Sequence, residues 1–245
     1  MGGIQRDFTV LPFGYDASAL SGHALSDRQQ SLLHRGGSAK RILLVSHYNY
    51  FRNFETVLRA LVRIKSILAE PVQLVLTTDI RPGANYGGYD ATPASRLIDR
   101  LGIRDNIAML GAVPYECLGA LYAACDLFVF PSYAESFGHP MVEAMAAGLP
   151  VVAADLTVHR EVCGEAARYF PPFDDAQLAE FCAEVLRDPD LHDCMRLRGL
   201  HRAADFSWDD HVEGLTALID RAVAERNVAD HNAGGRGRSK ISNDH

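Results

Sequence analysis

The sequence predicts an α/β fold, namely a Rossmann-like parallel sheet with helices on both faces. Short apolar runs of strand length recur along the chain, and they cover residues 41–46, 72–78, 106–110, 126–130, 151–155 and 167–170. Such continuous apolar runs are typical of strands that are buried on both faces. Segments with helical signals separate the runs. Strands that alternate with helices form a parallel sheet through right-handed crossovers.

The helices are predicted by apolar spacing and by residues that favour helix ends. Residues 54–68 place apolar side chains at intervals of three and four, which is the pattern of an amphipathic helix. Thr92 can cap a helix that begins with Pro93. Further helices are expected at residues 114–125, 140–147, 158–163, 175–187, 189–204 and 207–227. Ligands of such folds bind beyond the carboxyl ends of the strands, so a site is expected there.

Composition limits the class of protein. A chain of 245 residues forms one or two domains, and a net charge of −7 argues against a nucleic-acid partner. The five cysteines form no C-x-x-C pair and are expected to be reduced thiols. No apolar run approaches the roughly 18 residues that a membrane-spanning helix needs, and no signal peptide is recognisable. These features favour a cytoplasmic protein with at most peripheral contact to the inner membrane face.

Three regions are expected along the chain. Residues 1–38 lack clear periodicity and are predicted to be a linker. Residues 39–226 contain the regular alternation and form the predicted domain. Residues 227–245 are polar and rich in glycine, and they are expected to be a disordered tail.

The stretch from Phe130 to Pro150 carries the most informative pattern. Pro140 suits the first position of a short helix, and Gly148 and Pro150 can end it. That helix is apolar on nearly every face except at Glu143, so it is expected to be buried. A buried carboxylate requires a partner, and we expect it in the first turn, near free N–H groups. Glu135 lies on the loop before the same helix, so both carboxylates are predicted to face one space.

Other motifs restrict the ligand. The chain lacks G-x-G-x-x-G, the P-loop, C-x-x-C, H-E-x-x-H and G-x-S-x-G motifs. Arg52 begins the helix after the first strand and is either a phosphate contact or a solvated first-turn cation. His47 stands directly after the same strand, whereas the other histidines are interpreted as surface or core residues. A phosphate contact beside carboxylates, which bind sugar hydroxyls, suggests a nucleotide sugar as ligand.

The run Glu135-Ser136-Phe137-Gly138-His139-Pro140, followed by Glu143, resembles the Glu-x7-Glu signature of retaining GT-B glycosyltransferases, specifically glycosyltransferase family 4. The flanking segments DLFVFPSYAESFG, EAMAAGLPVVAAD, LGAVPYECLGALYAACD and FSWDDHVEGL are also similar to that family. The resemblance covers residues 41–226. It implies the C-terminal half of a GT-B fold, with residues 39–226 as the domain that binds the nucleotide sugar.

The resemblance also implies roles for individual residues. Glu143 would accept hydrogen bonds from the donor's ribose, and Glu135 would contact the transferred sugar. The N–H groups of Ser136, Phe137 and Gly138 would hold sugar hydroxyls or phosphate oxygens. Arg52 would stabilise the departing nucleoside diphosphate. Val113 falls where the family holds the nucleobase, although simple core packing explains it equally well.

The chain departs from the family in two loops. Ser46-His47 stands where the family commonly has Gly-Arg, so His47 would partly replace a second phosphate cation. Thr77-Thr78-Asp79 stands where the family often has a glycine-rich turn. The acceptor-binding N-terminal domain of GT-B enzymes is absent from this sequence, which suggests that a separate chain supplies it or that this chain is a fragment.

The function expected from this resemblance is that of a hexosyltransferase donor domain. It would take a UDP- or GDP-sugar as donor, with no metal and no cofactor. Two alternatives remain open: a non-catalytic module that binds nucleotide sugars or a protein partner, and another α/β nucleotide-binding enzyme such as an epimerase of the same fold.

Overall fold

The protein is described by a computed structural model that covers residues 9–16 and 22–235. In this part of the chain a six-stranded sheet has the order β5-β2-β1-β6-β7-β8, and every pairing within it is parallel. The strands are β1 (Lys40–Leu44), β2 (Val72–Leu76), β5 (Ile107–Met109), β6 (Leu127–Phe130), β7 (Val151–Ala154) and β8 (Ala167–Phe170). The predicted α/β class is confirmed.

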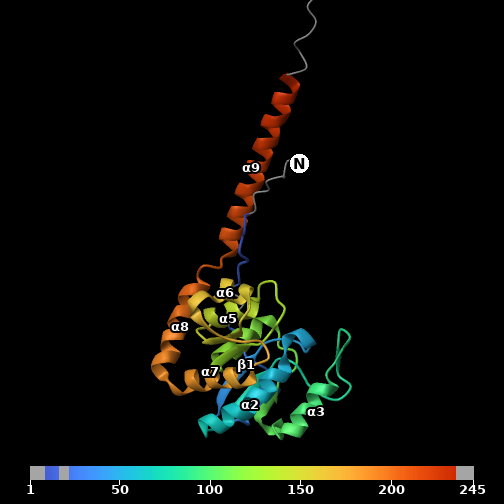
Figure 1. Ribbon diagram of the computed structural model, residues 1–245, viewed down its shortest axis with the longest axis vertical. Helices are drawn as coiled ribbons and strands as arrows, with labels where there is room; N and C mark the ends of the chain where they lie inside the picture. Colours follow the sequence, from blue (N-terminus) through green and yellow to red (C-terminus); the bar gives the residue numbers. More distant parts are fainter. Residues whose placement is uncertain (1–8, 17–21, 236–245) are drawn as a thin grey trace, which may run out of the picture. The chain divides into compact units, whose positions relative to one another are not determined.

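Helices cover both faces of this sheet (Figure 1). They are α1 (Asp27–His34), α2 (Phe54–Leu68), α3 (Thr92–Leu101), α4 (Leu118–Ala123), α5 (His139–Ala146), α6 (Thr157–Cys163), α7 (Asp175–Arg187) and α8 (Pro189–Ala203). Alternate residues of β6 face opposite sides, because side chains of a strand alternate. Phe128 and Phe130 contact rings of Tyr122 in α4 and His159 in α6. Leu127 and Val129 pack with residues of α2, α3 and α7.

The strand order reverses direction between β1 and β6. From β1 the chain builds outward through β2 to β5, and from β6 it builds outward the other way through β7 to β8. In parallel sheets a crevice forms at such a switch point, outside the carboxyl ends of the two central strands. The fold therefore places a ligand site between the loops that follow β1 and β6.

Three sequence expectations about elements are corrected. Residues 27–34, which were expected to lack regular structure, form α1, and a capping box of Ser26 and Gln29 begins it. Thr92 does not cap α3; its Oγ1 accepts a hydrogen bond from the N–H of Gly83 instead. The helix expected at 114–125 divides into a 3₁₀ turn, Tyr115–Cys117, and the shorter α4.

The described chain forms two compact units. One spans Tyr15–Asp205 and contains the sheet. In the other, residues 9–14 lie along α9 (Trp208–Gly235), where the ring of Phe13 lies 6.0 Å from that of Trp208. The helix predicted to end at residue 227 continues to Gly235, into the segment expected to be a tail. Residues 236–245 lie outside the described chain. None of the described helices is long and apolar enough to cross a bilayer.

Candidate functional site

Arg52 and Glu135 meet at the switch point of the sheet. Arg52 ends a 3₁₀ turn (Tyr50–Arg52) in the loop after β1, and Glu135 lies on the loop after β6. Their side chains form an ion pair and are only 21% and 11% exposed. Nη1 of Arg52 also donates a hydrogen bond of 3.1 Å to Oγ of Ser132. The structure therefore brings together the two residues predicted to be catalytic.

Two buried asparagines shape the loop that carries Arg52. Oδ1 of Asn49 accepts a hydrogen bond of 2.9 Å from the N–H of Arg52. Asn53 adopts a left-handed backbone (φ 53°) at the start of α2, a conformation that asparagine tolerates better than most residues. Its Nδ2 donates to the carbonyl oxygen of Pro131, and the N–H of Tyr133 donates to that of Phe51. These hydrogen bonds join the loops that follow β1 and β6, and they fix the positions of Arg52 and Glu135 relative to each other.

Glu143 occupies the buried helix α5 and is 4% exposed. Because α5 begins at His139, Pro140 takes its second position and Glu143 falls beyond the first turn, contrary to the sequence prediction. The partner of Glu143 is a tyrosine rather than the helix end: the hydroxyl of Tyr122 donates to its Oε2 at 2.9 Å. Burial, together with the Glu143 charge and hydrogen bond, raises the pKa of Tyr115 to about 12. Burial and the same carboxylate also raise the pKa of Tyr122 well above its ordinary value.

The segment between the two carboxylates has a constrained backbone. Gly138 adopts φ 89°, and a Cβ at this position would lie 2.6 Å from Cε of Met141, so only glycine fits without rearrangement. The N–H of Ser136 donates to Oε1 of Glu135 at 3.0 Å. Phe137 is buried, and its ring contacts that of His139. One of the three predicted backbone donors, the N–H of Ser136, thus donates to Glu135 of the same chain and orients its carboxylate.

The remaining predicted residues lie at two places on this edge. His47 is exposed after β1, with its Nε2 3.4 Å from Nδ2 of Asn49. Val113 is half-buried in the loop after β5, two positions before Tyr115. Since the Glu143 carboxylate contributes to the raised pKa of Tyr115, this loop reaches from the edge strand toward α5. Val113 is therefore close along the chain to Tyr115, and it follows the edge strand β5 rather than a strand of the switch point.

Sequence reasoning missed His159, which it had interpreted as a generic histidine. His159 is fully buried, its Nδ1 lies 2.7 Å from the carbonyl oxygen of Ala154, and its Nε2 has no hydrogen-bonding partner among the described residues. Burial is the main cause that lowers its pKa, and the charges of Glu135 and Arg52 act on it in opposite directions. No sequence signal predicts this position or the tyrosine partners of Glu143, because tertiary packing alone brings them together.

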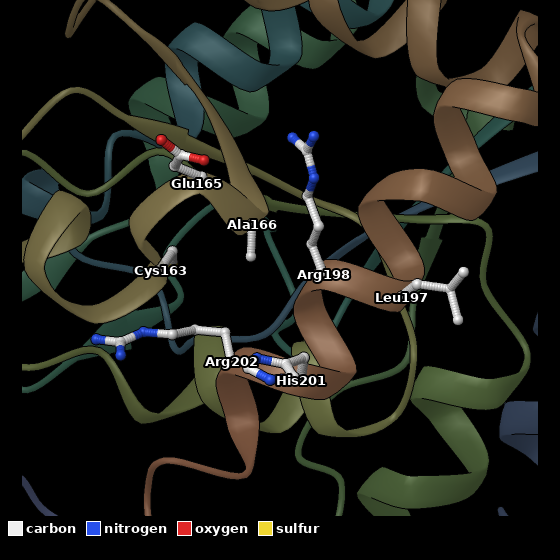
Figure 2. Close-up of a pocket in the computed structure, with 7 residues that line it drawn as sticks. All are labelled: Cys163, Glu165, Ala166, Leu197, Arg198, His201 and Arg202. Carbon is white, nitrogen blue, oxygen red and sulfur yellow. The ribbon is translucent and has the colours of Figure 1, made fainter.

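A separate cavity of about 500 Å³ lies near the start of β8. Figure 2 shows its lining residues, which come from the end of α6, the following turn and α8: Cys163, Glu165, Ala166, Leu197, Arg198, His201 and Arg202. The amino end of a parallel strand lies at the edge opposite to its carboxyl end. This cavity is therefore distinct from the Arg52–Glu135 site. The described residues contain no group of three or more His, Cys, Asp or Glu side chains that could hold a metal ion.

A parallel six-stranded sheet with helices on both faces, and with Arg52 and Glu135 at its switch point, defines a Rossmann-like α/β domain. The family described as glycosyl transferases group 1 matches residues 28–201, and the chain belongs to it. This match begins within α1 and ends within α8.

Curated relatives include mannosyltransferases. The chain is 38% identical over 128 residues to O-antigen chain mannosyltransferase B of Escherichia coli, which covers 52% of this chain and 33% of that protein. It is 32% identical over 174 residues to an MMP α-(1→4)-mannosyltransferase of Mycolicibacterium hassiacum, which covers 69% and 39%, respectively. The chain thus spans well under half the length of these two relatives.

Solved structures show the same fold. HepE of Anabaena, in a complex with UDP-glucose, has a TM-score of 0.70 at 22% identity over 85% of this chain and 56% of that one. The C-terminal domain of LpcC, a group 1 glycosyl transferase of Francisella tularensis, has a TM-score of 0.61 at 18% identity and covers 78% of this chain and 97% of that one. The predicted C-terminal half of a GT-B fold is confirmed.

Proposed function

We propose that this chain is the donor domain of a retaining hexosyltransferase that uses a UDP- or GDP-sugar. The observation that carries the proposal is the Arg52–Glu135 ion pair at the switch point of the sheet. Glu143, on the helix that follows the Glu135 loop, is a second carboxylate and accepts a hydrogen bond from the hydroxyl of Tyr122. A cation for phosphate and two acceptors for hydroxyl groups match the parts of a nucleotide sugar, and the family membership makes transfer of that sugar the reaction.

Each side chain has a role in this proposal. Arg52 contacts the diphosphate and stabilises the negative charge that develops on it as the glycosidic bond breaks. Glu143 accepts hydrogen bonds from the ribose. An ionised carboxylate has about four acceptor sites, so sites remain open beside its contact with Tyr122. The backbone of Phe137 and Gly138 approaches the sugar closely, and Ser136 keeps Glu135 oriented. His47 supplies a further polar contact to phosphate, and Val113 contacts the base through its backbone.

The ion pair also bears on how the sugar is transferred. A carboxylate that is paired with a guanidinium is stabilised as an anion, which makes it a weaker nucleophile. Glu135 is therefore proposed to position the sugar and to stabilise positive charge near the reacting carbon. Retention then follows from stabilisation of the leaving diphosphate, with the acceptor attacking from the same face.

The transferred sugar is proposed to be a hexose, with mannose as the first candidate because mannosyltransferases stand among the relatives. The chain spans less than half of these relatives. An acceptor-binding domain, in the same protein or in a partner chain, is proposed to complete the active site. The protein is proposed to act in the reducing cytoplasm. The cysteines of the described chain are free thiols, which supports this location, and Cys117, Cys163 and Cys182 are buried.

Titration calorimetry with UDP, GDP and their hexose conjugates tests the donor site. We expect binding of one nucleotide series, with Glu143→Ala weakening it. Arg198→Ala, which alters the remote cavity, is the matched control and should bind as the wild type does. If neither nucleotide series binds, or if Glu143→Ala binds as well as the wild type, the proposed donor site is wrong.

A further inference from the structure

Aromatic side chains are exposed around the Arg52–Glu135 pair. Tyr50, Tyr133 and Phe173 have exposed fractions of 51%, 38% and 60%. They follow β1, β6 and β8, so they all lie at the carboxyl edge of the sheet. Tyr50 precedes Arg52 by two positions, and Tyr133 precedes Glu135 by two. None of these three rings belongs to the buried core, and all three lie at the edge where such a fold places its ligand.

The first aromatic pair is Tyr50 and Tyr89. Their ring centroids are 5.1 Å apart at an interplanar angle of 83°. Tyr89 belongs to a small hairpin (β3, Asn85–Tyr86; β4, Tyr89–Asp90) in the loop after β2. The hydroxyl of Tyr86 anchors that hairpin through a 2.6 Å hydrogen bond to the carbonyl oxygen of Asp79. The hairpin thus places a ring on the β2 side of the switch point.

The second pair is Tyr133 and Phe173, with ring centroids 5.0 Å apart at 45°. Because β8 lies beyond β6 in the sheet, this pair stands on the opposite side of Arg52 and Glu135. Phe173 has a left-handed backbone (φ 72°), which is unfavourable for a bulky residue. Its ring is mostly exposed and so gains little from burial in this chain. A strained and exposed aromatic residue beside a site favours a role in binding.

The chemistry of the two pairs fits a neutral carbohydrate. A pyranose ring presents C–H groups on its faces, which pack against the π face of an aromatic ring, while its hydroxyl groups at the rim remain available for hydrogen bonds. Tyrosine suits such a ligand, because it offers an apolar face together with a hydroxyl group. Phosphate or a charged headgroup would instead require cations, and neither pair contains one.

We propose that the Tyr50–Tyr89 and Tyr133–Phe173 pairs bind the acceptor glycan, with its pyranose rings on either side of the transfer centre. This inference rests on the proposed function, because it takes Arg52 and Glu135 as the place where the sugar is transferred. The pairs are assigned to the acceptor because they contain no cation for a diphosphate, whereas Arg52 and Glu135 between them are proposed to take the donor. The donor domain would then contribute to acceptor recognition.

Saturation-transfer NMR tests the inference on the full chain with UDP or GDP present, using short neutral oligosaccharides of mannose, glucose and galactose as probes. Irradiation of aromatic protons should transfer saturation to protons on a pyranose face of at least one probe. Tyr50→Ala and Tyr89→Ala should each weaken that binding about three- to ten-fold, as expected for the loss of one ring contact. Tyr50→Phe and Tyr89→Phe keep the ring and should bind within about two-fold of the wild type.

Phe173→Gly separates binding from folding. Glycine tolerates the left-handed backbone, so thermal unfolding should occur at the same temperature or higher, while glycan binding falls. Calorimetry with UDP and GDP should give the same nucleotide affinity for all these variants. If nucleotide binding fails in the wild type but ring-dependent glycan binding persists, the proposed donor function is wrong and the glycan site stands. If no probe receives saturation, or the alanine variants bind as the wild type does, the glycan site is wrong.

Discussion

Arg52 and Glu135 are 83 residues apart in the sequence and form an ion pair in the structure. Both side chains are largely buried, and they join the loops of the two central strands of the sheet. In the chain alone, the guanidinium that is proposed to bind the diphosphate is therefore engaged by a carboxylate. Donor binding must share or replace this contact, so the two residues should affect nucleotide affinity in opposite ways.

Substitution of the pair tests this relationship. Arg52→Ala should weaken the affinity for the bound nucleoside diphosphate roughly ten- to hundred-fold, because a charged hydrogen bond to phosphate is lost. Glu135→Gln should leave that affinity unchanged or increase it, since it removes a negative charge near phosphate and releases the guanidinium. Calorimetry measures both, with Arg198→Ala as control. Equal losses of affinity in the two variants would contradict the proposed roles.

Tyr122→Phe should destabilise the folded protein. The hydroxyl of Tyr122 donates to the buried carboxylate of Glu143, and the variant leaves that acceptor with one donor fewer. We expect a loss of about 1–3 kcal/mol in the free energy of unfolding, measured in urea. In the Glu143→Gln background the loss should be smaller, because the buried charge is absent. Identical losses in both backgrounds would show that Tyr122 and Glu143 are not energetically coupled.

His159 should make stability depend on pH. Burial lowers its pKa in the folded state below the ordinary value of 6.5, so the unfolded state binds the proton more readily. Its contribution to stability is thus fully present above about pH 6.5 and is lost as the pH falls through the lower folded-state pKa. Urea unfolding across this range should show the loss, and His159→Gln should reduce the pH dependence. An unchanged pH profile in that variant would assign the dependence to other groups.

Gly138→Ala should destabilise the protein by more than its backbone conformation alone requires. The new Cβ would lie 2.6 Å from Cε of Met141, in addition to the cost of φ 89°. The expected loss is about 1–3 kcal/mol. Gly88→Ala is a matched control, because Gly88 has φ 97° and open space around it. Equal losses in the two variants, measured by urea unfolding, would show that packing against Met141 adds nothing.

The elements near the site were predictable to different degrees. The bounds of α2 and α7 agree with the sequence prediction, because apolar spacing and end signals act over a few residues. α1 was missed, although its capping box is visible as Ser26-x-x-Gln29, because its apolar pattern is weak. The helix start at His139 also differed from expectation by one residue, which was enough to move Glu143 beyond the first turn.

By itself the sequence determined the α/β class, the alternation of strands and helices along the chain, and the stretch that carries Glu135 and Glu143. Those features follow from local periodicity and from a contiguous motif. Only the tertiary structure decided that Arg52 pairs with Glu135, that Tyr122 satisfies Glu143, and that His159 lies buried beside them. The order β5-β2-β1-β6-β7-β8 places β1 beside β6. That order depends on how the whole sheet buries its apolar faces, which no short stretch of sequence encodes.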